Sequence, residues 1–454
     1  MSAAEIKLKD IKSAYFIGIG GIGMSAIARF LNTRGVQVSG YDKTSTTLTK
    51  TLESEGMQIH YSEDLSALPK QIDLVVYTPA IPDAHIELKY LKQSSIPVLK
   101  RAEVLGLLSR SMSCIGIAGT HGKTTTSTLL TYLLKEAGVD VSAFLGGISR
   151  DFGSNYVAGK SNWLVVEADE FDRSFLHLNP QIGSIISADA DHLDIYGTEK
   201  EILDGGFRAY AQQVEDRVFV NAAYADLFPN VANKVIYGIN TGDWYATNIE
   251  VRSGHFYFDL IGPEVHWKGL QSPLPGRHNI ENTVLALAIC CGFDLAENQL
   301  REALKSFKGI ARRFDRIIQR TDCVFVDDYA HHPTELNAAI SAVRELNPGK
   351  KLTGIFQPHL FSRTQDFAEG FGQALAALDE LYLLEIYPAR EEPIEGVDAA
   401  FLLDKVPLKH KQVVSKEALL EKIKGKRPDV LITLGAGDID RLVEPIKRIL
   451  ENQV

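Results

Sequence analysis

SCIGIAGTHGKTTT, residues 113–126, places an apolar segment, a glycine loop, a lysine and three threonines in that order. A helical pattern follows it, with Leu129, Leu130, Leu133 and Leu134 on one face. A buried strand that ends in a glycine loop and continues as a helix directs free backbone N–H groups and the positive helix end at an anion. This segment therefore predicts a phosphate-binding α/β domain.

The side chains of this loop suit a nucleoside triphosphate. Lys123 is placed to meet β- and γ-phosphates, and the Thr124 hydroxyl occupies a position that commonly ligates Mg²⁺. The spacing departs from the usual P-loop because Ile117 stands where the first glycine belongs. A chance lysine at a helix start is disfavoured, since strand, glycines, lysine and hydroxyls fall in the expected order. The expected nucleotide-binding residues are Gly119, Thr120, His121, Gly122, Lys123, Thr124 and Thr125.

A second glycine loop lies upstream, where GIGGIG at residues 18–23 follows an apolar run and precedes a helical pattern, with Asp42 at the end of the next strand. This pattern predicts a Rossmann-like diphosphate site. By itself it is compatible with NAD, or with a tight turn that binds nothing. Two such loops in one chain favour a reaction between a nucleotide-linked substrate and a nucleoside triphosphate. The expected substrate-binding residues here are Gly18, Gly20, Gly21, Ile22, Gly23, Met24, Ser25 and Asp42.

Acidic residues follow two further predicted strands. Glu167 comes after the strand at residues 163–166, and DADHLD at residues 189–194 comes after the strand at residues 182–187. Because Mg²⁺ prefers oxygen ligands, Glu167 is a good candidate and His192 a less usual one. For Glu170, Asp172 and Asp194 we expect a solvated acidic loop instead.

The length of 454 residues predicts about three domains. We place a Rossmann-like domain at residues 1–107, a central P-loop-type ATPase α/β domain at 108–312 and a Rossmann-like α/β domain at 313–454. The alternating pattern of residues 255–260 predicts a small antiparallel sheet in the central domain, and residues 308–313 suit a hinge.

Composition excludes several classes of protein. The net charge is −10 and no basic stripe occurs, which argues against a nucleic-acid partner. The polar N-terminus and the absence of an apolar run of about eighteen residues predict a cytoplasmic protein that does not insert into membranes. The four cysteines lack C-x-x-C spacing, so we expect buried, reduced thiols.

At this point the chain resembles the Mur ligase family over essentially all 454 residues. The motifs that carry the resemblance are GIGGIGMS (18–25), GTHGKTTT (119–126), EADEFDRSFL (167–176), DADHLD (189–194), GRHNIEN (276–282), RRFD (312–315), DDYAHHPTE (327–335), FQPHLFSRT (356–364) and LGAGDI (434–439).

The resemblance implies that the first domain holds a UDP-sugar, the central domain ATP and the last domain an amino acid. It also implies two Mg²⁺ sites, in which Mn²⁺ can substitute, with Thr124 and Glu167 at the first and His192 at the second. Further ATP contacts are implied for Asn279, Asn282, Arg313 and Asp328. From the residues alone, the two asparagines suit helix-start capping, and the other two suit an interdomain ion pair.

Tyr329, His331 and Arg363 resemble the family's amino-acid end of the site. For His332 a capped turn before Pro333 is the alternative interpretation. Some relatives carry an arginine where this chain has Leu360, so the resemblance does not supply a carboxylate contact at this position.

The implied reaction joins L-alanine to the lactyl carboxylate of UDP-N-acetylmuramate through an acyl phosphate formed from ATP. Its catalytic residues would be Lys123, Glu167, His192, His331 and Arg363, with His192 and His331 both open as the base. A monomer or weak homodimer is expected.

The rival within the family attaches a tripeptide to the same sugar nucleotide, and the segment at residues 167–180 lacks the longer insertion associated with it. A P-loop ATPase switch or a dinucleotide oxidoreductase would each leave one glycine loop unexplained.

Overall fold

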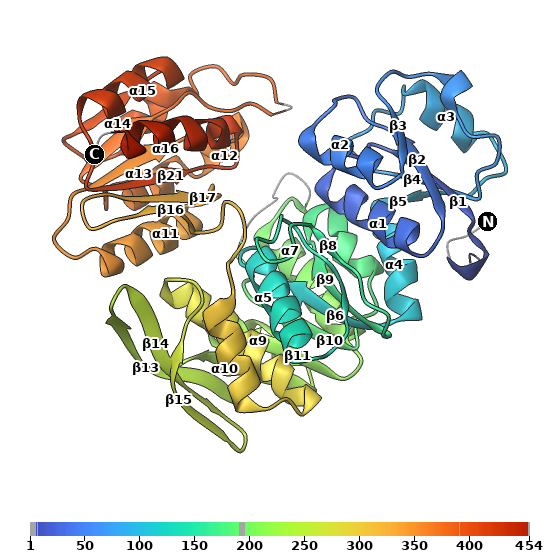
Figure 1. Cartoon of the computed structure of the whole chain (residues 1–454), viewed down its shortest axis with the longest axis horizontal. Helices are drawn as coiled ribbons and strands as arrows, with labels where there is room; N and C mark the ends of the chain where they lie inside the picture. Colours follow the sequence, from blue (N-terminus) through green and yellow to red (C-terminus); the bar gives the residue numbers. More distant parts are fainter. Residues whose placement is uncertain (1–5, 7, 190–195, 390, 453–454) are drawn as a thin grey trace. The chain divides into compact units, whose positions relative to one another are not determined.

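The computed structural model describes residues 6, 8–189, 196–389 and 391–452. Three sheets of five, ten and six strands follow one another along the chain (Figure 1), so the predicted three-part α/β organisation is confirmed. By contacts the chain forms two compact units: residues 1–246, 260–266 and 281–308 form the first, and residues 247–259, 267–280 and 309–454 form the second. The domain limits at residues 107 and 312 stay predictions.

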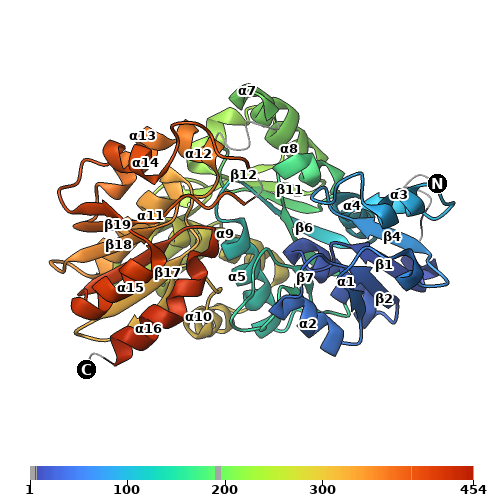
Figure 2. The same cartoon turned by 90° about the horizontal axis from the view of Figure 1, so that it is seen from above.

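The first sheet is parallel, in the order β3-β2-β1-β4-β5. Every residue of β1 is buried, as expected where helices cover both faces of a parallel sheet. Ala14 and Phe16 pack in a core with α1 and α4, whereas Tyr15 and Ile17 pack with α3; Figure 2 shows α1 beside β1 and β2. The strands are β1 (Ser13–Ile17), β2 (Gln37–Tyr41), β3 (Gln58–His60), β4 (Leu74–Tyr77) and β5 (Val98–Lys100). The helices are α1 (Ile22–Thr33), α2 (Thr47–Ser54), α3 (Ile86–Lys92) and α4 (Arg101–Ser111).

The second sheet has the order β15-β14-β13-β12-β11-β10-β6-β9-β7-β8. Its central strand β6 is parallel to both β9 and β10, so the carboxyl ends of these three strands lie together at the start of α5. The strands are β6 (Ser113–Ala118), β7 (Ser142–Phe144), β8 (Tyr156–Val157), β9 (Trp163–Ala168), β10 (Ile182–Ile185), β11 (Arg217–Asn221), β12 (Lys234–Ile239), β13 (Trp244–Arg252), β14 (His255–Gly262) and β15 (Val265–Gln271). The helices are α5 (Lys123–Glu136), α7 (Glu199–Ile202), α8 (Ala209–Gln213), α9 (Arg277–Cys290) and α10 (Glu297–Ser306).

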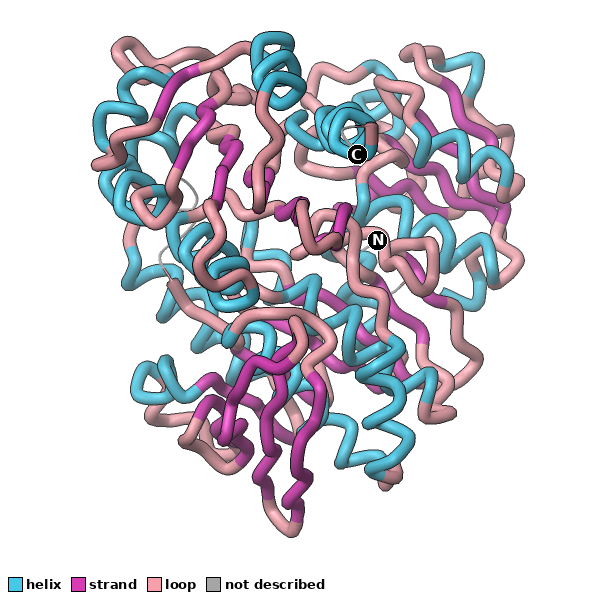
Figure 3. The backbone as a smooth tube through the Cα atoms, turned by 60° about the vertical axis from the view of Figure 1, so that its left-hand side comes forward, coloured by secondary structure: helices cyan, strands magenta, loops and turns pink. Residues whose placement is uncertain are grey.

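The predicted extra strands exist, but they extend the central sheet rather than form a separate one. β14 alternates buried and partly exposed residues as its sequence predicted, and β13, β14 and β15 are neighbours at one end of the ten-stranded order. Figure 3 traces them as long magenta segments. Only two residues, Ser253 and Gly254, separate β13 from β14.

The third sheet has the order β16-β17-β21-β18-β19-β20, with β16 antiparallel and the others parallel. Separate hydrophobic clusters cover its two faces. The strands are β16 (Asp315–Gln319), β17 (Val324–Asp328), β18 (Leu352–Phe356), β19 (Glu380–Leu383), β20 (Lys411–Val413) and β21 (Val430–Leu434). The helices are α11 (Pro333–Leu346), α12 (Phe361–Asp366), α13 (Ala368–Leu375), α14 (Ala399–Lys405), α15 (Lys416–Gly425) and α16 (Val443–Glu451).

Within the part of the chain that the structure describes, no helix has both the length and the apolar character that crossing a bilayer requires. Cys114, Cys290 and Cys323 are buried free thiols, as expected, but Cys291 is partly exposed.

Candidate active site

Backbone geometry forces glycine at two positions of the loop between β6 and α5. Gly122 caps the helix with φ +81, and Gly119 has φ +146. Residues that carry a side chain rarely adopt these φ values, and a Cβ on Gly119 would lie 2.9 Å from the Ser187 backbone nitrogen. The loop therefore keeps its backbone close to the neighbouring strand end and leaves the N–H groups of the first turn of α5 for an anion.

Lys123 lies at the centre of this loop. Its Nζ donates to the Gly119 carbonyl at 2.7 Å and to Glu170 Oε2 at 2.6 Å, with Asp169 at 4.0 Å. Burial alone would lower the pKa of Lys123, but the carboxylates of Glu170 and Asp169 outweigh it and raise that pKa. The lysine is therefore a fixed positive charge. The expectation of a solvated loop is wrong for Glu170, which is fully buried because it pairs with this ammonium.

Thr124 and Glu167 form the second polar pair of the loop, with the Thr124 hydroxyl donating to Glu167 Oε1 at 2.6 Å. The segment after β7 passes so close that a Cβ on Gly146 would lie 1.7 Å from Glu167 Oε2. A hydroxyl and a carboxylate beside a phosphate loop fit Mg²⁺, which binds few protein oxygens and keeps several waters. No cluster of three His, Cys, Asp or Glu side chains of metal-binding type occurs among the described residues. His192, the expected ligand of a second ion, lies outside the described residues.

The other predicted loop residues contact the end of β10. Thr120 Oγ1 and Ser187 Oγ are 2.9 Å apart, and the His121 backbone N–H donates to the same Ser187 oxygen at 2.8 Å. His121 Nε2 lies 3.4 Å from Asp189 Oδ2. Thr125 is buried on the first turn of α5. Ser187 thus holds the loop in place, although only its position at a strand end could have indicated this from the sequence.

The asparagines of α9 differ in their surroundings. Asn282 Oδ1 is 3.0 Å from where a Cβ on Gly122 would stand, so this amide borders the phosphate loop. Asn279 Nδ2 donates to the Pro275 carbonyl at 2.6 Å, which is not a capping contact, because a capping side chain accepts a backbone N–H. Burial lowers the pKa of the neighbouring His278 to about 4, so this imidazole is neutral at physiological pH.

The first glycine loop has internal partners that its motif did not reveal. Asp42 Oδ2 accepts the Gly20 N–H at 2.8 Å, and Gly18 has φ +86. The side chains of Met24 and Ser25 are buried, so any contact they make with a substrate would come from their backbone. Asp42 therefore shapes the loop, and the N–H of Gly20 is already satisfied.

A cavity of about 230 Å³ lies between the first turn of α1 and the end of β9. Gly23 lines it from the first turn of α1, and Glu167 and Asp169 line it from the end of β9. Arg101, the first residue of α4, also lines it: its guanidinium lies 3.6 Å from Asp169 and would be 2.6 Å from a Cβ on Gly23. Sequence reasoning missed Arg101 because it lies in no glycine loop, although it directly follows β5 at a strand end.

In the second compact unit, the Tyr329 ring contacts two guanidinium groups. Arg312 and Arg313 are 4.9 and 4.7 Å from its ring centroid, distances typical of cation–π contacts. Asp328 accepts the N–H groups of Phe314 and Ala330 at 2.7 and 2.8 Å. Burial raises the pKa of Asp328 to about 6, against the opposing charge of Arg313. The charge of Arg313 therefore acts on the buried Asp328 carboxyl at the start of the third sheet.

His331 lies beside this group, with Nδ1 3.0 Å from the Tyr329 carbonyl and 3.1 Å from Glu335 Oε2. Its ring also contacts the Tyr329 ring and the ring of His359, at centroid distances of 5.3 and 6.2 Å. Tyr329, His331 and His359 thus gather at the carboxyl ends of β17 and β18.

His332 and Leu360 occupy helix starts. His332 accepts the Thr334 N–H on its Nδ1 at 3.3 Å, which confirms the capped turn. Leu360 has φ +70 and directly precedes α12, on which Arg363 is partly buried.

Family models match the chain in three consecutive stretches: the Mur ligase family, catalytic domain at residues 13–112, the Mur ligase middle domain at 117–290, and the Mur ligase, glutamate ligase domain at 312–437. The chain belongs to the Mur ligase family. The predicted family is thereby confirmed, and membership supports ATP as the nucleotide.

Relatives of this Mur ligase span its whole length. A UDP-N-acetylmuramate–L-alanine ligase of Christiangramia forsetii is 47% identical, with 98% of each chain covered. One from Porphyromonas gingivalis is 46% identical and covers 97% of this chain and 99% of its own. The crystal structure of UDP-N-acetylmuramate-alanine ligase from Thermotoga maritima has a TM-score of 0.80 at 26% identity, covering 97% of this chain and 99% of that one. A murein peptide ligase from Psychrobacter arcticus, with a TM-score of 0.67 at 21% identity and coverage of 98% and 99%, shares the fold.

Proposed function

We propose that this Mur ligase joins L-alanine to the lactyl carboxylate of UDP-N-acetylmuramate, with ATP as the energy source. The observation that carries the proposal is the cavity that Gly23 of one glycine loop and Glu167 beside the other both line. A sugar nucleotide held by its diphosphate at the first loop and a triphosphate held at the second would bring their reacting ends into one space. The names of relatives at 46 and 47% identity over nearly the whole chain support the same reaction.

The first chemical step is attack of the lactyl carboxylate on the γ-phosphate, which forms an acyl phosphate and releases ADP. Two unit negative charges at 4 Å repel by about 4 kcal/mol at an effective dielectric constant near 20. Lys123 lowers this cost because its charge is held in place at the loop before the substrates arrive. Binding of the γ-phosphate would transfer part of the Lys123 interaction from Glu170 to the nucleotide.

Thr124 and Glu167 would hold Mg²⁺, and His192 would contribute to a second ion, with Mn²⁺ able to replace either. When bound, the ion supplies positive charge that neutralises the phosphate oxygens. The chain's own part is to orient the Glu167 carboxylate, which the Thr124 hydroxyl and the close approach of Gly146 do together.

Arg101 would bind an anionic group of the sugar nucleotide within the cavity. Its guanidinium already lies over Gly23 and next to Asp169. An arginine in this place offers the planar, two-pronged donor set that suits a carboxylate or a phosphate.

The second step is attack of the alanine amine on the acyl phosphate, which forms the amide and releases phosphate. Tyr329, His331 and Arg363 would hold the amino acid, and Arg313 with Asp328 would contact ATP. Arg363 would bind the alanine carboxylate without help from position 360, where Leu360 has no charge. His331, paired with Glu335, and His192 both remain candidates to accept the ammonium proton.

The test is a phosphate-release assay with the sugar nucleotide, ATP and Mg²⁺, in which the acceptor is L-alanine, glycine, L-serine or the tripeptide. We expect rapid release with L-alanine and product of the corresponding mass. Release with the tripeptide alone would replace our substrate by that of the recycling ligase. No release with any acceptor would contradict the ligase reaction itself.

A further inference from the structure

A network of polar contacts fastens the first turn of α1 to the segment that precedes β8. The Asn155 side chain donates from Nδ2 to the Ile22 carbonyl at 2.6 Å and to Ser25 Oγ at 3.0 Å. Its Oδ1 accepts from Arg29 Nη1 at 2.5 Å. Asn155 is fully buried, so these contacts exclude water.

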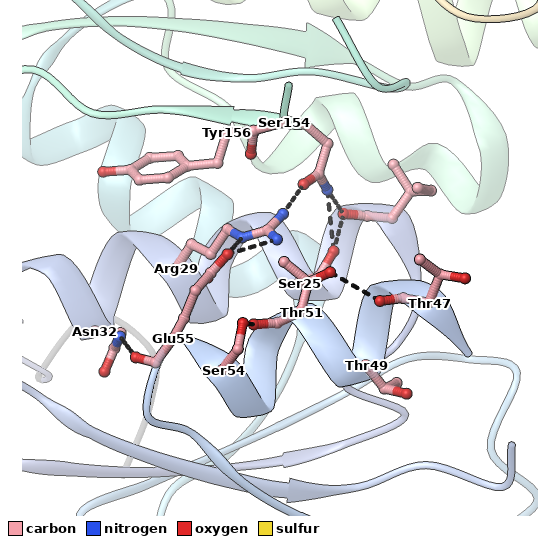
Figure 4. A network of polar contacts seen from close by, with 12 residues as sticks. Ser25, Arg29, Asn32, Thr47, Thr49, Thr51, Ser54, Glu55, Ser154 and Tyr156 are labelled. Carbon is pink, nitrogen blue, oxygen red and sulfur yellow. Dashed lines mark hydrogen bonds and ion pairs between the residues drawn. The ribbon is translucent and has the colours of Figure 1, made fainter. Parts of the chain in front are cut away.

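Arg29 determines which way the Asn155 amide faces. A guanidinium only donates hydrogen bonds, so it must face the amide oxygen, and the amide NH₂ is then directed at α1. Arg29 is itself held by Glu55, whose carboxylate accepts from Nε and Nη2 at 2.8 Å each. Figure 4 shows Arg29 between Glu55 and the Ser154–Tyr156 segment. The charge of Glu55 thus fixes, through Arg29, the orientation of a neutral amide.

The backbone of Asn155 is hydrogen-bonded to the segment that packs against Glu167, one of the two residues expected to hold Mg²⁺. Its carbonyl accepts the Leu145 N–H at 2.9 Å, and the next residue, Gly146, lies against the Glu167 carboxylate. Asn155 therefore contacts the turn that carries the first glycine loop and also the segment that packs on Glu167. The side chain of Asn155 makes the first of these contacts, and its backbone carbonyl makes the second.

We propose that Asn155 is a positioning residue, which holds the first turn of α1 at the distance from Glu167 at which the lactyl carboxylate meets the γ-phosphate. This inference rests on the proposed function, since it concerns two substrates bound at these two loops. Neither binding site contains the Asn155 side chain, so it acts on the relative placement of the substrates.

Other contacts besides this network also hold α1 against β7 and β8. Phe30 of α1 packs edge-on against Phe144 and Tyr156, at centroid distances of 5.4 and 6.2 Å. Thr33 Oγ1 and Tyr156 Oη also lie 3.2 Å apart. These contacts lie toward the far end of α1 and leave the first turn to Asn155. Asn155→Ala should therefore leave α1 packed against β7 and β8.

The experiment compares wild type with Asn155→Ala in the full-length chain. We expect kcat for phosphate release to fall about 100-fold, the cost of misplacing reacting groups by about 1 Å. The separate dissociation constants of the sugar nucleotide and of ATP should each change by less than about threefold. Arg29→Lys, which keeps the charge but not the fork of donors, should lower kcat less, and the double variant should be no slower than Asn155→Ala.

Tyr156→Phe is the matched control, because it removes a hydrogen bond from the same contact without touching the first turn. Its thermal midpoint should fall less than that of Asn155→Ala, because it loses one hydrogen bond at 3.2 Å rather than three at 2.5 to 3.0 Å, and its kcat should be unchanged. Equal kcat in both variants and wild type would show that the network only adds adhesion, and would overturn the proposal. Loss of sugar-nucleotide binding in Asn155→Ala would overturn it too. An inactive wild type would instead refute the proposed function on which it rests.

Discussion

Lys123 is paired with a carboxylate that a bound triphosphate would have to displace in part. Its ammonium lies 2.6 Å from the buried Glu170 carboxylate, and a triphosphate would compete for it. We expect Lys123→Ala to lower kcat by about 100- to 1000-fold, the usual cost of losing a fixed charge at a reacting oxyanion. Sugar-nucleotide affinity, measured by calorimetry, should stay within about threefold, since that substrate would bind the other loop. The added change Glu170→Gln should restore part of the stability, because it removes a buried negative charge that the Lys123 ammonium no longer balances, but it should not restore turnover.

The buried carboxyl of Asp327 should make the unfolding free energy depend on pH. Burial raises its pKa to about 6, although the Thr433 hydroxyl and Arg312 oppose this. The folded state then holds the proton more tightly than the unfolded state, so this group's contribution to stability is lost as the pH rises from about 4 to about 6. Relative to wild type, Asp327→Asn should therefore gain on the order of 2 to 3 kcal/mol in unfolding free energy between pH 4 and pH 7.5. Urea unfolding at the two pH values measures it, and a constant difference would contradict the prediction.

At the scale of the element, the segment between β7 and β8 packs closely against β9 and keeps the Glu167 carboxylate in place. In Gly146→Ala the new Cβ would lie 1.7 Å from Glu167 Oε2, so the carboxylate must move. We expect the Mg²⁺ concentration for half-maximal activity to rise about 10- to 100-fold, as when support of a metal ligand is lost. Gly153→Ala, on the same segment in open space at φ +60, serves as control and should cost stability by about 1 kcal/mol with unchanged Mg²⁺ dependence. The idea fails if the two variants respond alike to Mg²⁺.

At the scale of the whole molecule, two ligands on two sheets should stabilise independently. Each ligand at about 100 times its dissociation constant adds about 2.7 kcal/mol to the unfolding free energy of the compact unit that contains both loops. Thermal melts with the sugar nucleotide, with ATP and Mg²⁺, and with both should therefore show additive shifts. In Lys123→Ala only the shift caused by ATP should disappear. A second ligand that produces no further shift would mean that both compete for one place.

The amino-acid sequence determined the elements and the two loops of this protein. Strand, glycine loop and helix at residues 113–126 follow from local rules, because positive φ at Gly119 and Gly122 and an apolar strand need no distant partner. The alternation of β14 was equally readable, and Glu167 was found from its place at a strand end.

Only the tertiary structure decided which polar side chains turn inward. Glu170, expected in solvent, pairs with Lys123 from 47 positions away, and Asn155 reaches Ile22 across 133 positions. Asp42, directly after β2, accepts the Gly20 N–H of the first glycine loop, and Arg101 joins the cavity from the start of α4. Sequence periodicity indicates which residues of an element face the core. The partner of a buried charge depends instead on which strand ends the packed sheet brings together.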